Sequence, residues 1–203
     1  MRKIAFLLCC FSAFFSEARD YKPKYFTVAI NNYVTAKPII GMPKLFYSQW
    51  HPGITVSTGF DWKTKEKSSL NQSFKLGYMH HRYVQNSILL YTEIGKRFKP
   101  NDKLGLSIAI GGGYLHMIPG DEQFRKNNNG DWQKIKLKAR PQVMLSLSLG
   151  VDYKITTSGI RAFIRYQNML QTPFVPGYVP LLPYNVLHVG ASFPINIFKN
   201  QSK

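Results

Sequence analysis

The side chains in this sequence that could do the most varied chemistry are its histidines, His51, His80, His81, His116 and His188. Neutral imidazoles bind transition metals, and an imidazole beside a serine can act as the general base of a hydrolase. None of the five belongs to an HxxxH or HExxH motif, and the chain has no GxSxG motif, which are the local spacings used by such sites. Any site must therefore be assembled by the fold from distant segments.

The N-terminus indicates export from the cytoplasm. A basic pair precedes the apolar run IAFLLCCFSAFF at 4–15, which is too short to span a bilayer. Small residues follow at a cleavage position, so residues 1–18 are predicted to be a signal peptide. Both cysteines of the chain lie inside it. We therefore expect no disulfide and no cysteine metal site in the remainder.

The charge of the chain is strongly positive. The 203 residues carry a formal net charge of +17, and removing two basic and one acidic residue with the leader leaves 25 basic and 9 acidic residues, or +16. Such a charge suggests an anionic partner. An exported chain does not meet cytoplasmic nucleic acid, so we expect lipid phosphate groups as that partner and no nucleic acid. The alternative is that the basic loops are simply solvated.

Short segments of alternating apolar and polar residues recur along the rest of the chain. This pattern is typical of membrane-crossing β-strands. No later stretch approaches the ~20 apolar residues of a transmembrane helix. The sequence therefore predicts an all-β fold, an eight-stranded antiparallel transmembrane up-and-down β-barrel over residues 19–203. The eight segments are 25–36, 50–62, 71–83, 88–98, 103–117, 142–153, 159–170 and 184–195.

The segment KLGLSIAIGGGYLHM at 103–117 shows why a barrel is preferred to a soluble sheet. Leucine and isoleucine occupy the even positions from 104 to 110, whereas glycine, serine and alanine occupy the odd ones. An apolar face suits lipid, and small residues suit the interior of a narrow barrel. The glycines at 111–113 are accordingly interpreted as close-packed strand and not as a phosphate-binding loop.

The connections between these segments alternate in length. Outer-membrane barrels have short turns on the periplasmic side and longer loops outside. We therefore expect the cell outer membrane as the location, with both termini periplasmic. The expected outer loops are 37–49, 84–87, 117–132 and 171–183, and the expected inner turns are 63–70, 99–102 and 154–158.

A proline marks the edge of the sixth segment. Pro141 would interrupt a closed ladder of backbone hydrogen bonds. We therefore expect it to lie above this strand, and residues 133–140 to form a β-extension outside the membrane.

The alternation also directs a set of charged side chains inward. Their signs are mixed, and burial makes pairing obligatory because an unpaired ion is costly to desolvate. We expect a lumen polar network held by ion pairs and hydrogen bonds. Its members are Asp61, Lys75, Glu93, Arg97, Asp152, Arg161 and Arg165, together with Gln167.

The same alternation turns His51, His81 and His188 inward, within possible reach of one another, and His80 and His116 toward lipid. Three interpretations stay open. The inward rings could bind a metal, one could act as a general base beside a serine of a neighbouring segment (Ser48, Ser57 or Ser87), or all could be amphipathic rim residues. Glu93 lies too far down its strand to join them. We favour rim residues, with no metal and no cofactor.

The connection QTPFVPGYVPLLP at 171–183 is apolar and stiffened by prolines. An apolar external loop must cover something. It could cap the barrel mouth, insert at the headgroup boundary, or dock on a larger outer-membrane protein. The apolar residues considered for docking are Phe174, Tyr178, Val179, Leu181 and Leu182.

The leader, the eight alternating segments and the final stretch LHVGASFPINIF resemble the small outer-membrane β-barrel proteins of Gram-negative bacteria. The motifs KLFYSQWHPGITVSTGF and FVPGYVPLLPYNVLHVGASF resemble more narrowly a family of outer-membrane barrels of Bacteroidota. The wider class includes lipid A deacylases and palmitoyltransferases. However, the stretch His80-His81-Arg82 lacks the serine and asparagine that follow in the deacylase pattern.

These observations predict an integral outer-membrane barrel with a structural or accessory role, in contact with outer-membrane lipid and lipopolysaccharide. One alternative is a subunit docked on a larger outer-membrane protein. The other is a lipid A-modifying hydrolase or acyltransferase with a rim histidine and serine, for which His51, His81, His188 and Ser57 are the candidates.

Overall fold

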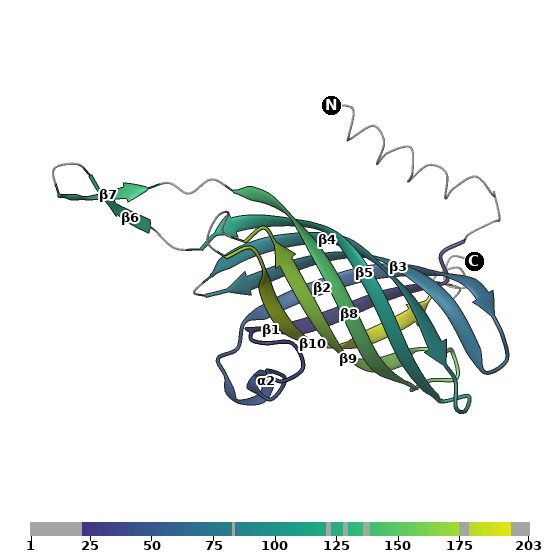
Figure 1. Ribbon diagram of the computed structural model, residues 1–203. Coiled ribbons are helices and arrows are strands. Elements are labelled where there is room, and N and C mark those ends of the chain that lie inside the picture. The colour runs from purple at the N-terminus through teal and green to yellow at the C-terminus, as the bar shows by residue number, and fades with distance from the viewer. Residues whose placement is uncertain are drawn as a thin grey trace.

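The computed structural model describes residues 22–82, 84–120, 123–127, 130–135, 139–174 and 179–195. Eight strands close into a barrel in which all neighbours are antiparallel (Figure 1). The predicted fold class is confirmed. The barrel strands are β1 (Tyr25–Thr35), β2 (Pro52–Thr64), β3 (Ser68–His81), β4 (Gln85–Phe98), β5 (Leu104–Pro119), β8 (Arg140–Lys154), β9 (Arg161–Thr172) and β10 (Leu182–Pro194). The predicted signal peptide lies outside the described residues.

The barrel closes through its first and last strands. β1 pairs with β10 from Tyr25 opposite Pro194 to Thr35 opposite Tyr184, and its other edge pairs with β2. Closure satisfies the backbone groups that an open sheet would leave at its edges.

Side chains alternate between the two faces of the wall as the sequence pattern predicts. On β8, Leu145, Leu147 and Leu149 point outward and are 43–54% exposed, whereas the intervening Ser146 and Ser148 are at most 4% exposed. The glycines at 111–113 lie inside β5. An added Cβ at Gly111 would collide with the backbone of Thr92, which confirms the close-packed strand.

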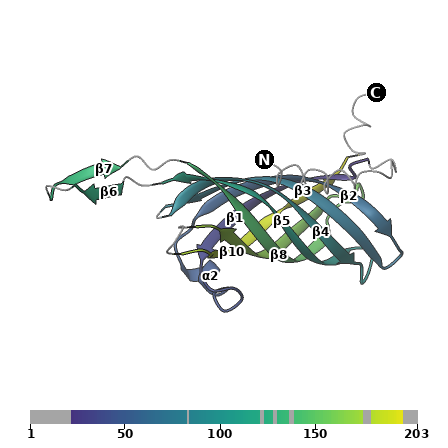
Figure 2. The same ribbon diagram turned by 45° about the horizontal axis from the view of Figure 1, so that its top comes forward.

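The two ends of the barrel differ. We call the end with connections 65–67, 99–103 and 155–160 the turn end, and the other the loop end. The loop end carries α2 (Lys44–Tyr47) and a hairpin of β6 (Gln123–Lys126) and β7 (Trp132–Ile135). This hairpin projects well beyond the barrel (Figures 1 and 2). No helix among the described residues is long and apolar enough to cross a membrane.

Several strands are longer than predicted. β3 begins at Ser68 and β4 at Gln85, three residues before each expected start, so the inner turn expected at 63–70 is only 65–67. The added residues are mostly polar, and for that reason the apolar alternation did not mark them as strand.

The expectation for Pro141 was wrong. It is the second residue of β8 and lies opposite His116. Proline lacks a backbone N–H, but so near the end of the strand it removes only a terminal hydrogen bond of the ladder, which a barrel tolerates. The expected β-extension at 133–140 is also corrected. Residues 132–135 form β7, which pairs with β6 in a sheet of its own and does not lengthen β8, and residues 136–138 are not described.

Candidate functional site

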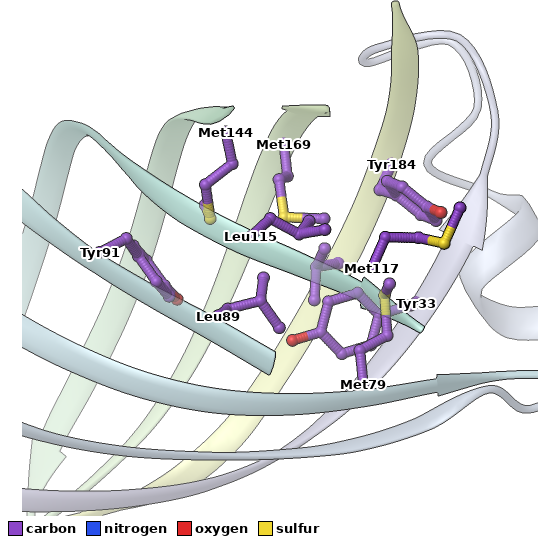
Figure 3. Packing of buried hydrophobic residues seen from close by; sticks show 10 residues of the cluster. Tyr33, Met79, Leu89, Tyr91, Leu115, Met117, Met144, Met169 and Tyr184 are labelled. Atoms are coloured by element: carbon purple, nitrogen blue, oxygen red, sulfur yellow. The ribbon is translucent and has the colours of Figure 1, made fainter. Parts of the chain in front are cut away.

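The loop-end half of the lumen is filled by apolar side chains, which we call the apolar plug. Methionines, leucines and tyrosines from the strands around the barrel converge there (Figure 3), and each is at most 5% exposed. Unbranched methionine adapts to an irregular interior. The plug consists of Tyr33, Met79, Leu89, Tyr91, Leu115, Met117, Met144, Met169, Tyr184 and Val186.

A chain of amides lies at the mouth above this plug. Gln85 and Gln171 exchange hydrogen bonds of 2.8 and 3.0 Å, and Gln171 also donates to Gln142. Gln142 in turn donates to the carbonyl of Pro173 at 2.6 Å. These bonds connect β4, β9 and β8 across the mouth, so the loop end is closed by polar as well as apolar packing.

The middle of the lumen is organised around Glu93, whose side chain is 1% exposed. Lys75 from β3 donates to one carboxylate oxygen. The other accepts hydrogen bonds from Ser146, Ser148 and Gln167 at 2.9, 2.7 and 2.8 Å. Four strands therefore meet at one carboxylate, and its desolvation is offset by charge-assisted hydrogen bonds.

A histidine joins this network through Gln167. The amide nitrogen of Gln167 donates to Glu93, and its oxygen lies 3.0 Å from Nε2 of His188. Because an amide oxygen only accepts, His188 is the donor. Among the described residues Glu93 does not join the histidines in a cluster of potential metal ligands, but Gln167 connects it to His188. The stagger of neighbouring strands brings β9 between them, so a single amide spans the gap.

The turn-end half contains a second ionic cluster around Asp152. Arg97 binds it bidentately, with Nε and Nη2 at 2.8 and 2.7 Å from its two oxygens. Arg161 donates to the same carboxylate and also to the carbonyl of Lys103 at 2.6 Å. Bidentate arginine pairs are among the stronger ionic contacts in proteins.

A cavity of about 260 Å³ lies in this turn-end half. Its wall includes Asp61, which pairs with Lys24 at 3.2 Å, and Arg165, whose Nη1 is 3.8 Å from Glu93. The guanidinium of Arg165 also lies over the ring of Phe163, 5.4 Å from its centroid. All seven charged residues predicted to point inward thus lie at ion pairs in the lumen or its turn-end mouth.

The structure brings two of the three inward histidines together. The rings of His51 and His81 stack at 3.7 Å with 13° between their planes, and Tyr184 meets His81 edge-on at 6.2 Å. His188 lies lower, opposite Asn31 on β1. No group of three or more potential metal ligands occurs within the described ranges, and the stacked pair packs beside the plug at the rim.

Ser57 is not brought to these rings. It points inward on β2, opposite Lys75, and is six residues from His51. At about 3.3 Å per residue this separation is about 20 Å. Since His51 stacks on His81, Ser57 is far from both rings of the stacked pair and forms no serine–histidine dyad with either.

The two remaining histidines point outward as expected. His80 Nδ1 lies 2.6 Å from Asn86, and His116 Nδ1 lies 2.6 Å from the hydroxyl of Tyr114. Both contacts are on the outer wall near the loop end, where amphipathic aromatic residues are common in membrane barrels.

The apolar residues of the 171–183 connection differ in how far they are buried. Phe174 is half-buried, and its backbone N–H donates to Pro180 at 3.2 Å. Leu182 begins β10 and packs against the plug, whereas Leu181 is 52% exposed. Val179 is half-buried, and Tyr178 lies outside the described residues. Part of the connection therefore caps the mouth and part is exposed.

Comparison with known proteins identifies the fold and nothing finer. No family model and no curated protein sequence matches the chain. Among solved structures, Neisserial surface protein A has a TM-score of 0.53 and 10% identity, covering 86% of this chain and 99% of its own. The outer membrane enzyme PagL has a TM-score of 0.48 and 11% identity, and the match covers 84% of this chain and 99% of PagL. Ail of Yersinia pestis, solved in complex with the heparin analogue sucrose octasulfate, has a TM-score of 0.45 and 9% identity. The match covers 85% of this chain and 99% of Ail. The chain has the eight-stranded outer-membrane β-barrel fold.

Proposed function

We propose that the protein is an integral outer-membrane barrel with a structural or accessory role, and that it catalyses no reaction. The observation that carries this proposal is the filled lumen, whose apolar plug is at most 5% exposed. A filled barrel offers no path for solutes. The distance between Ser57 and the stacked histidines also argues against a hydrolase of the expected kind.

The outer wall supports insertion in a membrane. Leu90, Ile110, Leu147 and Ile164 point outward at mid-strand and are 43–68% exposed. An apolar belt of this extent is unfavourable in water and matches the hydrocarbon layer of a bilayer. We propose outer-membrane lipid and lipopolysaccharide as its partners, in agreement with the basic charge of the chain.

We further propose that the loop end faces outward and that both termini are periplasmic, because bacterial barrels place their long connections outside. Trp132→Cys in β7 should react with a membrane-impermeant maleimide on intact cells, whereas Asn101→Cys should react only after the outer membrane is opened. The opposite labelling pattern would reverse the orientation. Equal labelling of both in the soluble fraction would refute membrane insertion.

One alternative is an accessory subunit docked on a larger outer-membrane protein through the 171–183 connection. The exposed side chain of Leu181 favours it. Purification in mild detergent should then recover a stoichiometric partner, which Leu181→Ser should release. The motifs at 44–60 and 174–193 support a source among the Bacteroidota, in which this experiment would be done.

The second alternative is a lipid A-modifying enzyme. It is favoured by the buried pair of His51 and His81, since neither ring nitrogen of His81 has a hydrogen-bond partner. Lipid A from a deletion strain should be compared by mass spectrometry with lipid A from strains that express the wild type or His81→Phe. We expect identical spectra. A mass change restored by the wild type but not by His81→Phe would establish the enzyme.

A further inference from the structure

Residues 36–50, which are all but the last residue of the segment between β1 and β2, fold over the outer wall of the barrel. We call these residues the flap. The side chain of Asn185 points outward from β10 yet is completely buried, because its amide donates to the carbonyls of Ala36 and Lys37 at 3.2 and 3.1 Å. Gly41 packs so closely that an added Cβ would lie 2.8 Å from this amide. Figure 1 shows α2 beside the wall and not across the mouth.

Two further strands hold the flap. The backbone N–H of Ile39 lies 3.3 Å from both Tyr166 and Asn168, which point outward from β9. On β1, Asn32 donates to the carbonyl of Leu45 at 3.1 Å and accepts from the N–H of His51 at 3.1 Å. The flap is therefore anchored at its beginning and middle, and by His51, the residue that follows its end.

These contacts explain an irregularity of the wall. Polar side chains are costly on a surface that faces hydrocarbon unless they have hydrogen-bond partners. Tyr166, Asn168, Asn185 and Asn32 all point outward near the loop end, and the backbone of the flap supplies their partners. The wall at this place is built to be covered by the flap.

Covering the wall turns the apolar side chains of the flap outward. Leu45 alone is buried against the barrel, at 5% exposure. The other large aliphatic and aromatic side chains of the flap are exposed. They are Ile39 at 70%, Ile40 at 81%, Met42 at 39%, Phe46 at 71%, Tyr47 at 73% and Trp50 at 56%.

We propose that the flap lies in the outer leaflet of the membrane, with these side chains among the lipids and with Lys37 and Lys44 on phosphate groups of anionic lipid. The inference rests on the proposed membrane insertion. The strands that carry or border the flap also present outward apolar residues of the belt, since Ile30, Ile54 and Val189 are register neighbours and 50–60% exposed. Aromatic and basic residues together are typical of membrane interfaces.

The charge of the flap complements such lipids. Residues 36–50 contain two lysines and no acidic residue, and both lysines are exposed. Each basic side chain near an anionic surface is expected to change the lipid-bound population about fivefold.

Single-cysteine labelling tests this placement, because both native cysteines lie in the predicted leader. The chain from residue 19 would be refolded in phosphatidylcholine vesicles containing phosphatidylglycerol, with an environment-sensitive fluorophore on Phe46→Cys. Matched labels on Ile110→Cys and Trp132→Cys would report the belt and the projecting hairpin. We expect spin-labelled lipid to quench the labels at 46 and 110, and aqueous iodide to quench the label at 132.

The labels at 46 and 110 distinguish the placement of the flap in the leaflet from the insertion of the barrel in the membrane. If the label at 110 is quenched by lipid while that at 46 is quenched only by iodide, the flap is not in the leaflet, and its patch is free for a protein partner. If the label at 110 also remains in water, the proposed membrane insertion fails. Gly41→Val, which displaces the flap from Asn185, should raise iodide quenching at 46 and leave 110 unchanged.

The lysines are tested in the same vesicles. In the labelled protein that keeps both lysines, removing phosphatidylglycerol should lower the quenching of the label at 46 by lipid. Lys37→Gln combined with Lys44→Gln should abolish this dependence on phosphatidylglycerol. Lys126→Gln in the hairpin is the control and should leave it intact. A dependence that persists in the double variant would overturn the role of the two lysines.

Discussion

The two halves of the lumen are filled by different means. The loop-end half is packed with methionines, leucines and tyrosines, whereas the turn-end half contains paired charges around a cavity of about 260 Å³. A single strand passes through both. The inward residues of β8 run from Met144 in the plug, through Ser146 and Ser148 on Glu93, to Asp152 between two arginines.

The two kinds of filling are expected to respond differently to substitution. Apolar packing is adaptable, since a flexible side chain can be exchanged for one of similar volume. A buried ion pair is not adaptable, because removal of one partner leaves the other charged and desolvated. The barrel is thus expected to be tolerant at its loop end and sensitive at its centre.

The largest effect is expected at Glu93. Glu93→Gln leaves Lys75 without its carboxylate in a site where both side chains are at most 3% exposed. The free energy of unfolding should fall by about 3–5 kcal/mol, measured by urea unfolding in lipid vesicles. Glu66→Gln in the exposed turn is the control. An equally small change in both variants would show that the central ion pair is not essential.

Truncation in the plug should have a comparable or smaller effect. Met169→Ala removes a fully buried side chain and should lower the free energy of unfolding by about 2–5 kcal/mol. Met169→Leu nearly conserves volume and should cost less than about 1.5 kcal/mol. If leucine were as damaging as alanine, the plug would be less adaptable than the ionic half, and the comparison would be reversed.

The hydrogen-bonded link between Glu93 and His188 through Gln167 should contribute less to the free energy of unfolding than the central ion pair or the plug. Gln167→Met keeps the length of the side chain but removes both hydrogen bonds, and should cost about 1–3 kcal/mol. The same unfolding assay measures it. His188→Gln in the Gln167→Met background should add little, because the link is already broken. Fully additive losses would mean that the two residues act independently.

The smallest effect is expected at the pair that is most exposed to solvent. Lys24 lies just before β1, and its side chain is 55% exposed beside Asp61. Exposed pairs contribute about 0–1 kcal/mol, so Lys24→Gln should hardly change the unfolding midpoint. A loss as large as that of Glu93→Gln would show that solvent exposure does not separate the strong from the weak pairs in this lumen.

The alternation of the sequence predicted the eight barrel strands and their inward faces, but not the polar residues at the starts of β3 and β4. Residues such as Leu145 and Ser146 differ so sharply that a period of two assigns each to a side of the wall. It could not predict which inward residues meet across the lumen. That depends on strand tilt and stagger, which bring Gln167 between Glu93 and His188. The separation of Ser57 from His51, by contrast, follows from their spacing of six residues along the chain.

The loop-end elements were not predictable in the same way. α2 has only four residues, too few for a helical period to show, and the hairpin strands β6 and β7 are equally short. A signal was nevertheless present in the pair Asn31-Asn32, which interrupts the apolar pattern of β1. Asn32 points outward because it holds the flap, so a polar residue on an outer face can indicate that a loop covers it.

Closure of the barrel by the plug can be measured as ion conductance. The purified protein would be inserted in planar lipid bilayers, with folding verified by heat-modifiable migration on gels. We expect no stable conductance from the wild type, because the side chains of the plug fill the loop-end half and are at most 5% exposed. A reproducible stepwise conductance from the folded wild type would contradict the account and indicate a pore.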